Sequence, residues 1–326
     1  MEKVLIIGYG SIGRRHAIVL RKLGFDVAFF RSGKSTLIKN DKNSLGLNVY
    51  FNLDEAVEKF KPKYAVDCSP SSLHLKNIFK LYSYRINTLI EKPLIINDPN
   101  SVDLINLRKI LDKKDYFVGI GFQYRFHPLI NKLKNIYENL KDKNIIIGNV
   151  TWTEYLPDWH TWENYKDSYS ARRELGGGCL LTLCHPFDYL HYIFNEASFK
   201  KTIPIEGRLE IKVNQTIKSY FSSNKIKDLN LYLDFDSKIK RHTINIEGKD
   251  WSIFSNLNNG YLHMKSSNAE SININLGTID RNDQFRDMHL EYYNWINGQG
   301  DFRSKLKDHL ELAIYLSKEN KKFYLE

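Results

Sequence analysis

The chain up to about residue 121 alternates short apolar runs with amphipathic segments. Five apolar runs predict buried strands, at residues 4–8 (VLIIG), 25–30 (FDVAFF), 64–69 (YAVDCS), 86–91 (INTLIE) and 116–122 (YFVGIGF). Between the runs, apolar residues recur at helical spacing, so that Ile12, His16, Val19 and Leu23 share one face of a predicted helix. Strands that alternate with helices in this way predict a parallel sheet covered by helices on both faces.

Local signals mark where these helices begin and end. Gly24 stands where a helix C-terminus needs a left-handed residue. Asn52 followed three residues later by Glu55 resembles a capping box and predicts a helix start. A further helix is predicted over residues 71–82, and Asp98-Pro99 is predicted to open the next one.

The pattern changes after Gly121, where a second domain is predicted over residues 122–326. A helix (127–140) and a long strand (144–155) are followed by alternating apolar and polar residues at 207–223, 228–236 and 242–248. Two more helices are predicted at 289–298 and 304–320. Alternation of this kind is typical of an antiparallel sheet with one face packed and the other open, so this domain is predicted to be α+β.

Composition narrows the class of protein. A chain of 326 residues with 42% apolar residues predicts two globular domains. No apolar run approaches the roughly 18 residues of a membrane span, and MEKVLIIGYG lacks the features of a signal peptide. Three cysteines without a CxxC pair favour reduced thiols in the cytoplasm.

The formal charge of +10 comes from scattered lysines rather than from a basic stripe. This distribution indicates a solvated lysine-rich surface, or a preference for phosphate-bearing ligands, and does not favour nucleic acid as a partner.

A glycine motif joins the first predicted strand to the first predicted helix. It runs G-x-G-x-x-G and contains the expected cofactor contacts Gly8, Gly10, Ser11, Ile12 and Gly13. Such glycines permit a tight turn and let the backbone approach a pyrophosphate at a helix N-terminus. The first domain, 1–121, is therefore predicted to be a doubly wound Rossmann domain that binds a dinucleotide.

The end of the second strand indicates which dinucleotide. An enzyme that uses NAD usually has an acidic residue there, but this chain has Arg31 and Ser32. These residues suit a 2′-phosphate, so NADP is favoured over NAD. The alternative is an exposed turn in a chain that still binds NAD.

Further motifs follow in a characteristic order. Ser69-Pro70 comes after one strand and Glu91-Lys92-Pro93 after the next, and a Gly-Gly-Gly run precedes a helix with His185 and Asp188. This ordered set resembles the Gfo/Idh/MocA oxidoreductase family over nearly the whole chain. Residues 121–128 and 155–178 are similar to a branch associated with surface-polysaccharide and sugar-nucleotide biosynthesis.

The resemblance implies a Rossmann domain followed by a domain with an open-faced β-sheet, which often mediates oligomers. We therefore expect a homo-oligomer, a dimer or tetramer formed through the C-terminal sheet. It also implies a sugar or sugar-nucleotide substrate between the domains and a cofactor held by Ser69, Pro70, His74, Glu91, Lys92 and Pro93.

Lys92 matches the catalytic lysine of the family and His185 its catalytic histidine. Hydride transfer to or from a carbinol carbon leaves a proton to be moved as well. A cationic lysine polarises the carbonyl oxygen, and a histidine near neutrality exchanges the proton. The alternatives are an ordinary strand-end lysine at Lys92 and a satisfied buried histidine at His185.

One position departs from the family pattern. Many members carry an aspartate four residues before the histidine, where this chain has Leu181. Proton transfer would then rest on His185, Lys92 or a group from the long connection after Tyr155. Pro186 predicts that the helix starts or kinks there, and Asn195 predicts a left-handed helix end.

Polar and aromatic side chains around this region are candidates for substrate contact. They are Gln123, Arg125, Asp158, His160, Trp162, Tyr165, Arg172, Thr182 and Asp188. A structural role is open for each of them. Cys179 and Cys184 have no metal-binding spacing and are expected to pack, so no metal site is predicted.

These observations predict an NAD(P)-dependent oxidoreductase that moves a hydride between nicotinamide and a hydroxyl or keto carbon of a sugar or sugar nucleotide. The alternative is a non-catalytic sensor or scaffold with the same fold, which the absence of the aspartate permits.

Overall fold

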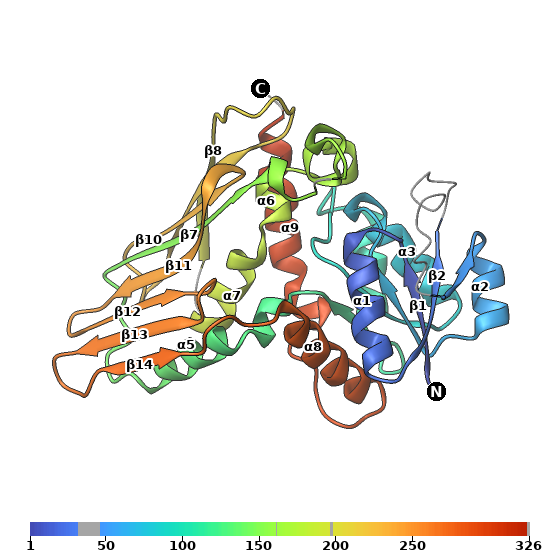
Figure 1. The fold of residues 1–326 in the computed structure, drawn as a ribbon, viewed down its shortest axis with the longest axis horizontal. Helices are drawn as coiled ribbons and strands as arrows, with labels where there is room; N and C mark the ends of the chain where they lie inside the picture. Colours follow the sequence, from blue (N-terminus) through green and yellow to red (C-terminus); the bar gives the residue numbers. More distant parts are fainter. Residues whose placement is uncertain (32–45, 161, 196–197, 325–326) are drawn as a thin grey trace. The chain divides into compact units, whose positions relative to one another are not determined.

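The computed structural model describes residues 1–31, 46–160, 162–195 and 198–324. The chain divides into two compact units (Figure 1). The first unit comprises Met1–Gln123 and Asn282–Ile314, and the second comprises Tyr124–Arg281 and Tyr315–Glu326. Each is described below on its own.

The described part of the first unit contains a six-stranded sheet in the order β3-β2-β1-β4-β5-β6. Its strands are β1 (Lys3–Ile7), β2 (Asp26–Phe30), β3 (Asn48–Tyr50), β4 (Tyr64–Asp67), β5 (Asn87–Ile90) and β6 (Val118–Ile120). Every neighbouring pair is parallel. This order reverses direction at β1, which is the doubly wound arrangement of a Rossmann domain, and the predicted fold class of this unit is confirmed.

The helices of the first unit are α1 (Ser11–Lys22), α2 (Leu53–Phe60), α3 (Ser71–Ser83), α4 (Val102–Leu111) and most of α8 (Arg281–Ile296). The predicted cap of α2 is confirmed, because the Asn52 side chain accepts a hydrogen bond from the Glu55 backbone N–H. The prediction for α4 was wrong by a few residues. The helix is capped by the Ser101 hydroxyl, which accepts from the Leu104 N–H, and so begins after Asp98-Pro99.

The C-terminal segment that contains α8 returns to the first unit. Tyr292 is fully buried, contacts the Tyr64 ring at 5.2 Å, and donates a hydrogen bond to the Phe117 carbonyl at 3.1 Å. Ser304 donates to the Ile120 carbonyl at 2.7 Å. The predicted division at residue 121 lies close to the junction after Gln123, but it did not anticipate that residues 282–314 pack against β4 and β6.

The second unit contains an eight-stranded sheet in the order β14-β13-β12-β11-β7-β10-β9-β8. Its strands are β7 (Ile147–Tyr155), β8 (Ser198–Ile205), β9 (Thr216–Ser222), β10 (Leu229–Asp234), β11 (Asp236–Glu247), β12 (Trp251–Asn256), β13 (Tyr261–Ser266) and β14 (Ile272–Asn275). The described pairs are antiparallel except β7 with β10. The predicted mostly antiparallel sheet is confirmed.

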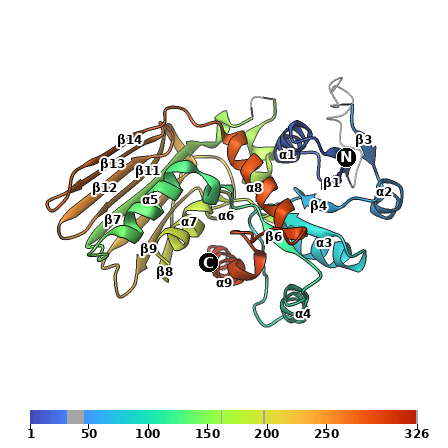
Figure 2. The same cartoon turned by 90° about the horizontal axis from the view of Figure 1, so that it is seen from below.

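Helices α5 (Pro128–Asn139) and α7 (His185–Phe194) lie along one face of this sheet, as Figure 2 shows. Helix α6 (Cys179–Thr182) precedes α7, and α9 (Leu310–Lys322) closes the chain. Within the described residues, no helix combines the length and apolar character needed to cross a bilayer.

The predicted strand over 207–223 is only partly correct, since β9 begins at Thr216. The Gln215 side chain accepts from the Leu209 N–H and donates to the Leu209 carbonyl, both at 2.7 Å. These two bonds close residues 209–215 into a loop and satisfy backbone groups that a strand would pair with a neighbour.

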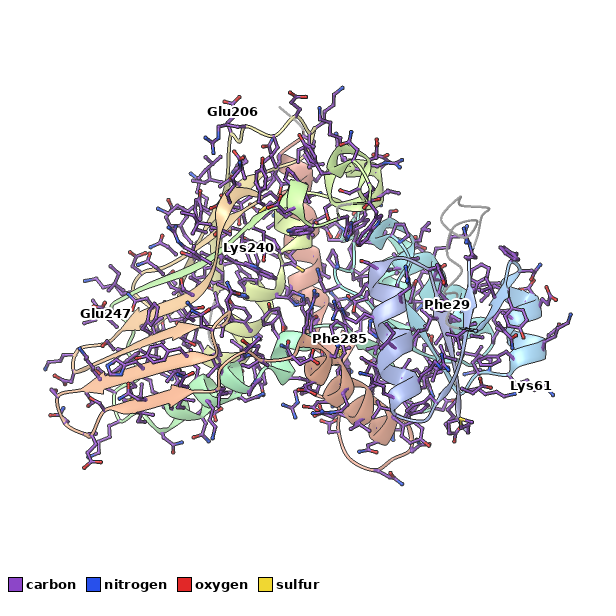
Figure 3. All side chains as sticks on the ribbon, viewed as in Figure 1. Phe29, Lys61, Glu206, Lys240, Glu247 and Phe285 are labelled. Carbon is purple, nitrogen blue, oxygen red and sulfur yellow. The ribbon has the colours of Figure 1, made fainter. Side chains whose placement is uncertain are left out.

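Burial follows the predicted pattern of apolar and polar positions (Figure 3). The aromatic rings of Phe29 and Phe285 are fully buried in the first unit, whereas Lys61, Glu206, Lys240 and Glu247 are exposed.

Candidate cofactor and catalytic site

The glycine loop between β1 and α1 provides the space that a dinucleotide needs. A Cβ on Gly8 would lie 2.7 Å from the Cys68 carbonyl oxygen, and one on Gly13 would lie 2.3 Å from the Gly8 carbonyl oxygen. Gly8 also has a φ of +98°. No described atom lies within 4 Å of a Cβ on Gly10, so this glycine borders open space. Two glycines thus permit close packing, and the third leaves the backbone accessible.

Helix α1 begins at Ser11 with Ile12 and Gly13 in its first turn, and it has no acidic residue there. Its N-cap, Gly10, has no side chain to occupy the first backbone N–H groups. These N–H groups and the positive end of the helix dipole suit an anionic pyrophosphate. The predicted residues therefore fit the group that the motif implies.

The turn after β4 is held by Asp67. Its Oδ1 accepts from the Ser69 N–H at 3.0 Å, and its Oδ2 accepts from the Asn77 amide at 2.9 Å. Asn77 also donates to the Ser69 hydroxyl oxygen at 3.0 Å. Ser69 and Pro70 are consequently fixed at the carboxyl end of the sheet, where doubly wound proteins bind ligands.

His74 on α3 bridges two of the predicted cofactor loops. It is 1% exposed, with Nε2 2.9 Å from the Ser69 carbonyl oxygen and Nδ1 3.0 Å from the Pro93 carbonyl oxygen. The turn after β4 and the turn after β5 are therefore connected through one imidazole.

Glu91 and Lys92 follow β5 and differ in exposure. Glu91 is 6% exposed, and its Oε1 lies 2.9 Å from His16 Nε2. A Cβ on Gly121 would lie 2.8 Å from the same oxygen. Lys92 is partly exposed and is joined to the buried Pro93 by a cis peptide bond. The acidic residue is thus held inside the domain, and the lysine is more accessible.

The end of β2 carries Arg31. Its N–H donates to the Tyr50 carbonyl at 3.0 Å, and its guanidinium lies 6.0 Å from the centre of the Phe51 ring. Ser32, the second residue predicted to bind a 2′-phosphate, lies outside the described residues. The preference for NADP stays a prediction that rests on Arg31.

In the second unit, His185 begins α7 inside a group of rings. It is 1% exposed, and its ring centre lies 4.9 Å from that of Tyr124 and 6.0 Å from that of Trp152. Trp152 stacks on His242 at 4.3 Å, and the Tyr189 hydroxyl lies 3.1 Å from His242 Nε2. Tyr124, Trp152, Tyr189 and His242 are not among the residues that the sequence pattern predicts for the site. Trp152 and His242 are direct cross-strand neighbours on β7 and β11, so only the strand register would have revealed them.

Burial keeps His127, His242 and Tyr124 uncharged near neutral pH. It lowers the pKa of His127 to about 4, and it lowers the pKa of His242 well below its ordinary value, with a smaller contribution from His127. It also raises the pKa of Tyr124 to about 12. These three side chains therefore add no charge to the surroundings of His185.

The low pKa of His127 predicts a pH-dependent loss of stability. An unfolded histidine binds a proton below a pH of about 6.5, whereas the folded His127 binds one only near pH 4. The unfolded state binds more protons across this window, so the free energy of unfolding falls by about 3 kcal/mol as the pH drops from 7 to 4.

His127→Asn is the matched variant for this prediction. The His127 ring accepts from the Leu129 N–H at the start of α5, and asparagine retains such a cap without titrating. Urea unfolding at several pH values should give the variant a flatter pH dependence than the wild type. An equal dependence of the free energy of unfolding on pH in the variant and the wild type would contradict the assignment of the effect to His127.

Arg125 and Asp188, two of the predicted substrate contacts, form a buried ion pair. Arg125 Nε lies 3.0 Å from both carboxylate oxygens of Asp188, and Nη2 lies 2.8 Å from Oδ1. The side chains are 9% and 1% exposed. The guanidinium also lies 4.9 Å from the centre of the Tyr192 ring. Asp188 is therefore engaged with Arg125 and is poorly suited to replace the missing carboxylate.

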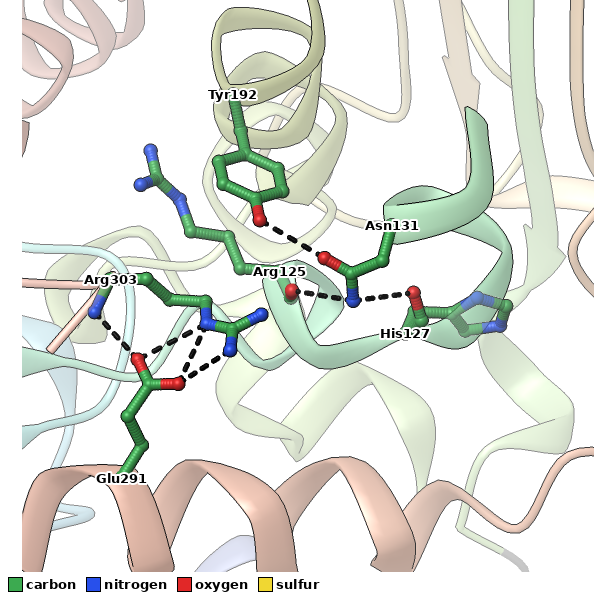
Figure 4. A network of polar contacts seen from close by, with 6 residues as sticks. All are labelled: Arg125, His127, Asn131, Tyr192, Glu291 and Arg303. Carbon is green, nitrogen blue, oxygen red and sulfur yellow. Dashed lines mark hydrogen bonds and ion pairs between the residues drawn. The ribbon is translucent and has the colours of Figure 1, made fainter. Parts of the chain in front are cut away.

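Asn131 fixes the turn that carries Arg125 (Figure 4). Its amide donates to the carbonyls of Arg125 and His127 at 3.1 and 3.2 Å, and its Oδ1 accepts from the Tyr192 hydroxyl at 3.0 Å. The turn before α5 is thus bonded to α7 through Tyr192, and all three hydrogen bonds lie in the second unit. Figure 4 also draws the ion pair of Glu291 with Arg303, which belongs to the first unit.

The run from Gly176 to Asp188 forms two short helices rather than one. Helix α6 ends at Thr182, and α7 begins at His185 with Pro186 in its first turn. Leu181 is fully buried. It lies on α6, which precedes the helix that carries His185. The predicted start at Pro186 and the left-handed end at Asn195, with φ of 57°, are confirmed.

The glycines and cysteines of this run have packing roles. A Cβ on Gly178 would lie 2.7 Å from the Asn214 amide nitrogen. Asn214 accepts from the N–H groups of Cys179 and Leu180, both at 2.8 Å. Burial raises the pKa of the Cys179 thiol well above its ordinary value, and Cys184 is also buried. Within the ranges that the structure describes, no cluster of His, Cys, Asp or Glu is arranged to hold a metal ion.

The remaining candidates lie on the connection after β7 and on α6. His160 Nδ1 lies 2.6 Å from the Glu163 carboxylate, and its ring stacks on Trp162, which is 64% exposed. Arg172 pairs with Glu174 at 2.7 Å. Asp158 ends the short helical turn after β7, and Thr182 ends α6. Tyr165 lines a hollow of about 720 Å³ together with Tyr155, Arg208 and Asp236.

Gln123, the last residue of the first unit's N-terminal part, is 1% exposed. Neither its amide nitrogen nor its amide oxygen has a hydrogen-bond partner among the described residues. Buried amides are normally satisfied, so this side chain retains capacity for a ligand.

The family follows from the first unit. Residues 2–122 match the model of the Gfo/Idh/MocA oxidoreductase family, described as an NAD-binding Rossmann fold. This domain belongs to the Gfo/Idh/MocA oxidoreductases. The predicted family is thereby confirmed for residues 2–122, which contain the glycine loop and the Glu91-Lys92-Pro93 turn described above.

Similar proteins extend the comparison. An uncharacterized oxidoreductase of Synechocystis sp. is 26% identical over 149 residues, which span 45% of this chain and only 38% of that relative. Levoglucosan dehydrogenase in complex with NADH is similar with a TM-score of 0.80 and 14% identity, over 98% of this chain and 97% of its own. UDP-N-acetylglucosamine 3-dehydrogenase of Acidithiobacillus ferrooxidans has a TM-score of 0.76 and 14% identity, over 99% and 98%. These structures share the two-domain fold along the whole chain.

Proposed function

We propose that the protein transfers a hydride between a nicotinamide dinucleotide and a hydroxyl or keto carbon of a sugar or sugar nucleotide. The observation that carries the proposal is the pairing of an open glycine loop at Gly10 with the turn at Lys92 in one family domain. Arg31 at the end of β2 supports NADP over NAD, because a guanidinium suits a 2′-phosphate.

Lys92 and His185 would move the proton that accompanies hydride transfer. A bound nicotinamide supplies or accepts the hydride itself. The Lys92 ammonium would donate a hydrogen bond to the substrate oxygen and stabilise negative charge on it. A ring nitrogen of His185 would hold the exchanged proton. Lys92 belongs to the first unit and His185 to the second.

The absence of an aspartate at position 181 affects which residues can transfer the proton. Leu181 stands in its place, and Asp188 is bonded to Arg125. We therefore assign the proton to His185 and Lys92 rather than to a carboxylate of α7. Gln123 would bind a substrate hydroxyl through its amide.

The substrate class is supported by two relatives whose names include sugar derivatives, levoglucosan and UDP-N-acetylglucosamine. Exposed Trp162, stacked on His160, would suit the face of a sugar ring. We propose a role in glycan precursor synthesis in the cytoplasm, carried out by a homo-oligomer formed through the sheet of the second unit.

Titration and turnover test the proposal directly. The protein should bind NADPH more tightly than NADH, as measured by quenching of protein fluorescence. A panel of UDP-sugars and free sugars, screened with NAD and NADP at 340 nm, should include at least one compound that changes the absorbance. Cofactor binding without turnover of any compound would instead favour a sensor or scaffold, which the Leu181 substitution permits. A protein that binds neither NADH nor NADPH would refute both the oxidoreductase and the sensor or scaffold function.

A further inference from the structure

A buried chain of four polar side chains crosses the first unit and ends at Glu91. It runs from Tyr64 on β4 through His289 on α8 and His16 on α1 to the carboxylate. The four side chains are 0, 0, 0 and 6% exposed. The successive distances are 3.4 Å, 2.8 Å and 2.9 Å. His289 and Tyr64 have no part in the assignments above.

Chemistry determines the direction of the hydrogen bonds in this chain. A carboxylate only accepts, so the His16 proton lies on Nε2 and is donated to Glu91 Oε1. If His16 carries only this proton, its Nδ1 accepts from His289 Nε2–H, and His289 Nδ1 in turn accepts from the Tyr64 hydroxyl. All three protons are therefore donated toward Glu91.

The electrostatics of the chain agree with this direction. Burial, with a smaller contribution from His16, lowers the pKa of His289 well below its ordinary value, so this ring is neutral and carries one proton. Burial raises the pKa of Tyr64, so the phenol keeps its proton. Neither His289 nor Tyr64 therefore adds a charge beside the Glu91 carboxylate.

The series of hydrogen-bonded side chains ends at Glu91, where the proposed catalytic turn begins. Glu91 directly precedes Lys92, and its backbone N–H donates to the Asp67 carbonyl at 2.8 Å. Gly121 leaves no room for a side chain on the other side of the carboxylate. We propose that His16 and His289 are positioning residues, which fix Glu91 and thereby the turn that carries Lys92. This inference rests on the proposed function.

The same hydrogen bonds connect α8 to the rest of this domain. Helix α8 contributes His289 from a point nearly 200 residues after Glu91 in the sequence. Phe285, one turn earlier, contacts the edge of the His16 ring at 4.9 Å. The returning helix thus both shields His16 from water and supplies the donor that selects its tautomer.

The tautomers can be tested on the full-length protein by ¹⁵N-histidine NMR at pH 7.5. The expected result is that His16 and His289 each carry one proton, on Nε2. Assignment follows from the signals lost in His16→Gln and His289→Gln. A proton on Nδ1 alone, or on both nitrogens of either ring, would overturn the inference.

The positioning role is tested by NADPH binding in three variants. His289→Leu removes the donor to His16, and we expect about fivefold weaker binding. His289→Gln retains an amide donor and should remain within about twofold of wild type. His309→Leu is the matched control, since His309 is equally buried in the same unit but contacts Lys305 and Phe122. Equal effects of the two leucine variants would overturn the positioning role.

The two measurements separate this inference from the proposed function. Wild-type protein that binds NADH but lacks the predicted tautomers overturns the inference alone. Wild-type protein that has the tautomers but binds neither NADH nor NADPH overturns the proposed function, and the positioning role with it.

Discussion

Lys92→Ala should lower the turnover of a sugar substrate by about a thousandfold while changing the affinity for the cofactor by no more than about threefold. The expected loss reflects the removal of a cation that stabilises charge on the substrate oxygen, a contribution of roughly 10² to 10⁴ in rate for groups of this kind. The cofactor affinity should persist because the glycine loop at Gly10 and the start of α1 are unchanged.

Lys61→Ala is the matched control for Lys92. Lys61 is an exposed lysine of the same unit, at the end of α2, and its removal should leave turnover within about twofold. Steady-state rates at 340 nm and a fluorescence titration of NADPH would be measured for both variants. Turnover by Lys92→Ala within tenfold of wild type would contradict the catalytic assignment.

Much of the first unit could be predicted because its signals are local. Buried parallel strands appear as continuous apolar runs, and helix caps such as Asn52 are determined by neighbouring residues. The residues predicted to bind the cofactor could also be located in the fold, because parallel strands present their carboxyl ends at one edge of the sheet. Ser69 and Lys92 could be located as soon as the strands before them were predicted.

The features that could not be predicted depend on contacts between distant parts of the chain. The buried face of α8, with Phe285, Met288 and Tyr292, is visible as a helical pattern, but nothing local indicates that it packs against β4. The tautomers of His16 and His289 require the same long-range packing. Strand register likewise determines that Trp152 stacks on His242 beside His185.

The prediction for Asp188 differed for a related reason. It lies three positions after His185, so the sequence alone could suggest that it orients the histidine or contacts substrate. Its partner Arg125 lies 63 residues earlier, on a turn whose conformation depends on Asn131. The structure therefore changes what Asp188 is expected to do, from orienting His185 or contacting substrate to joining α7 to the turn at Arg125.

Removal of either partner of this ion pair should strongly destabilise the second unit. Asp188→Ala would leave the Arg125 guanidinium buried without its carboxylate, at a cost of about 3–5 kcal/mol in the free energy of unfolding. Arg125→Met should cost a similar amount by leaving Asp188 buried. For a unit of this size, such a loss corresponds to a decrease of roughly 6–20 °C in Tm.

The double variant Arg125→Met with Asp188→Leu distinguishes a structural role from a catalytic one. Apolar replacement of both partners removes the buried charges together, so most of the stability should return, and turnover should return with it. If Asp188 supplied the proton-transfer group that Leu181 lacks, the double variant would be stable but inactive. Thermal unfolding and turnover of the two single variants and the double variant would therefore decide whether His185 acts with a carboxylate of α7 or without one.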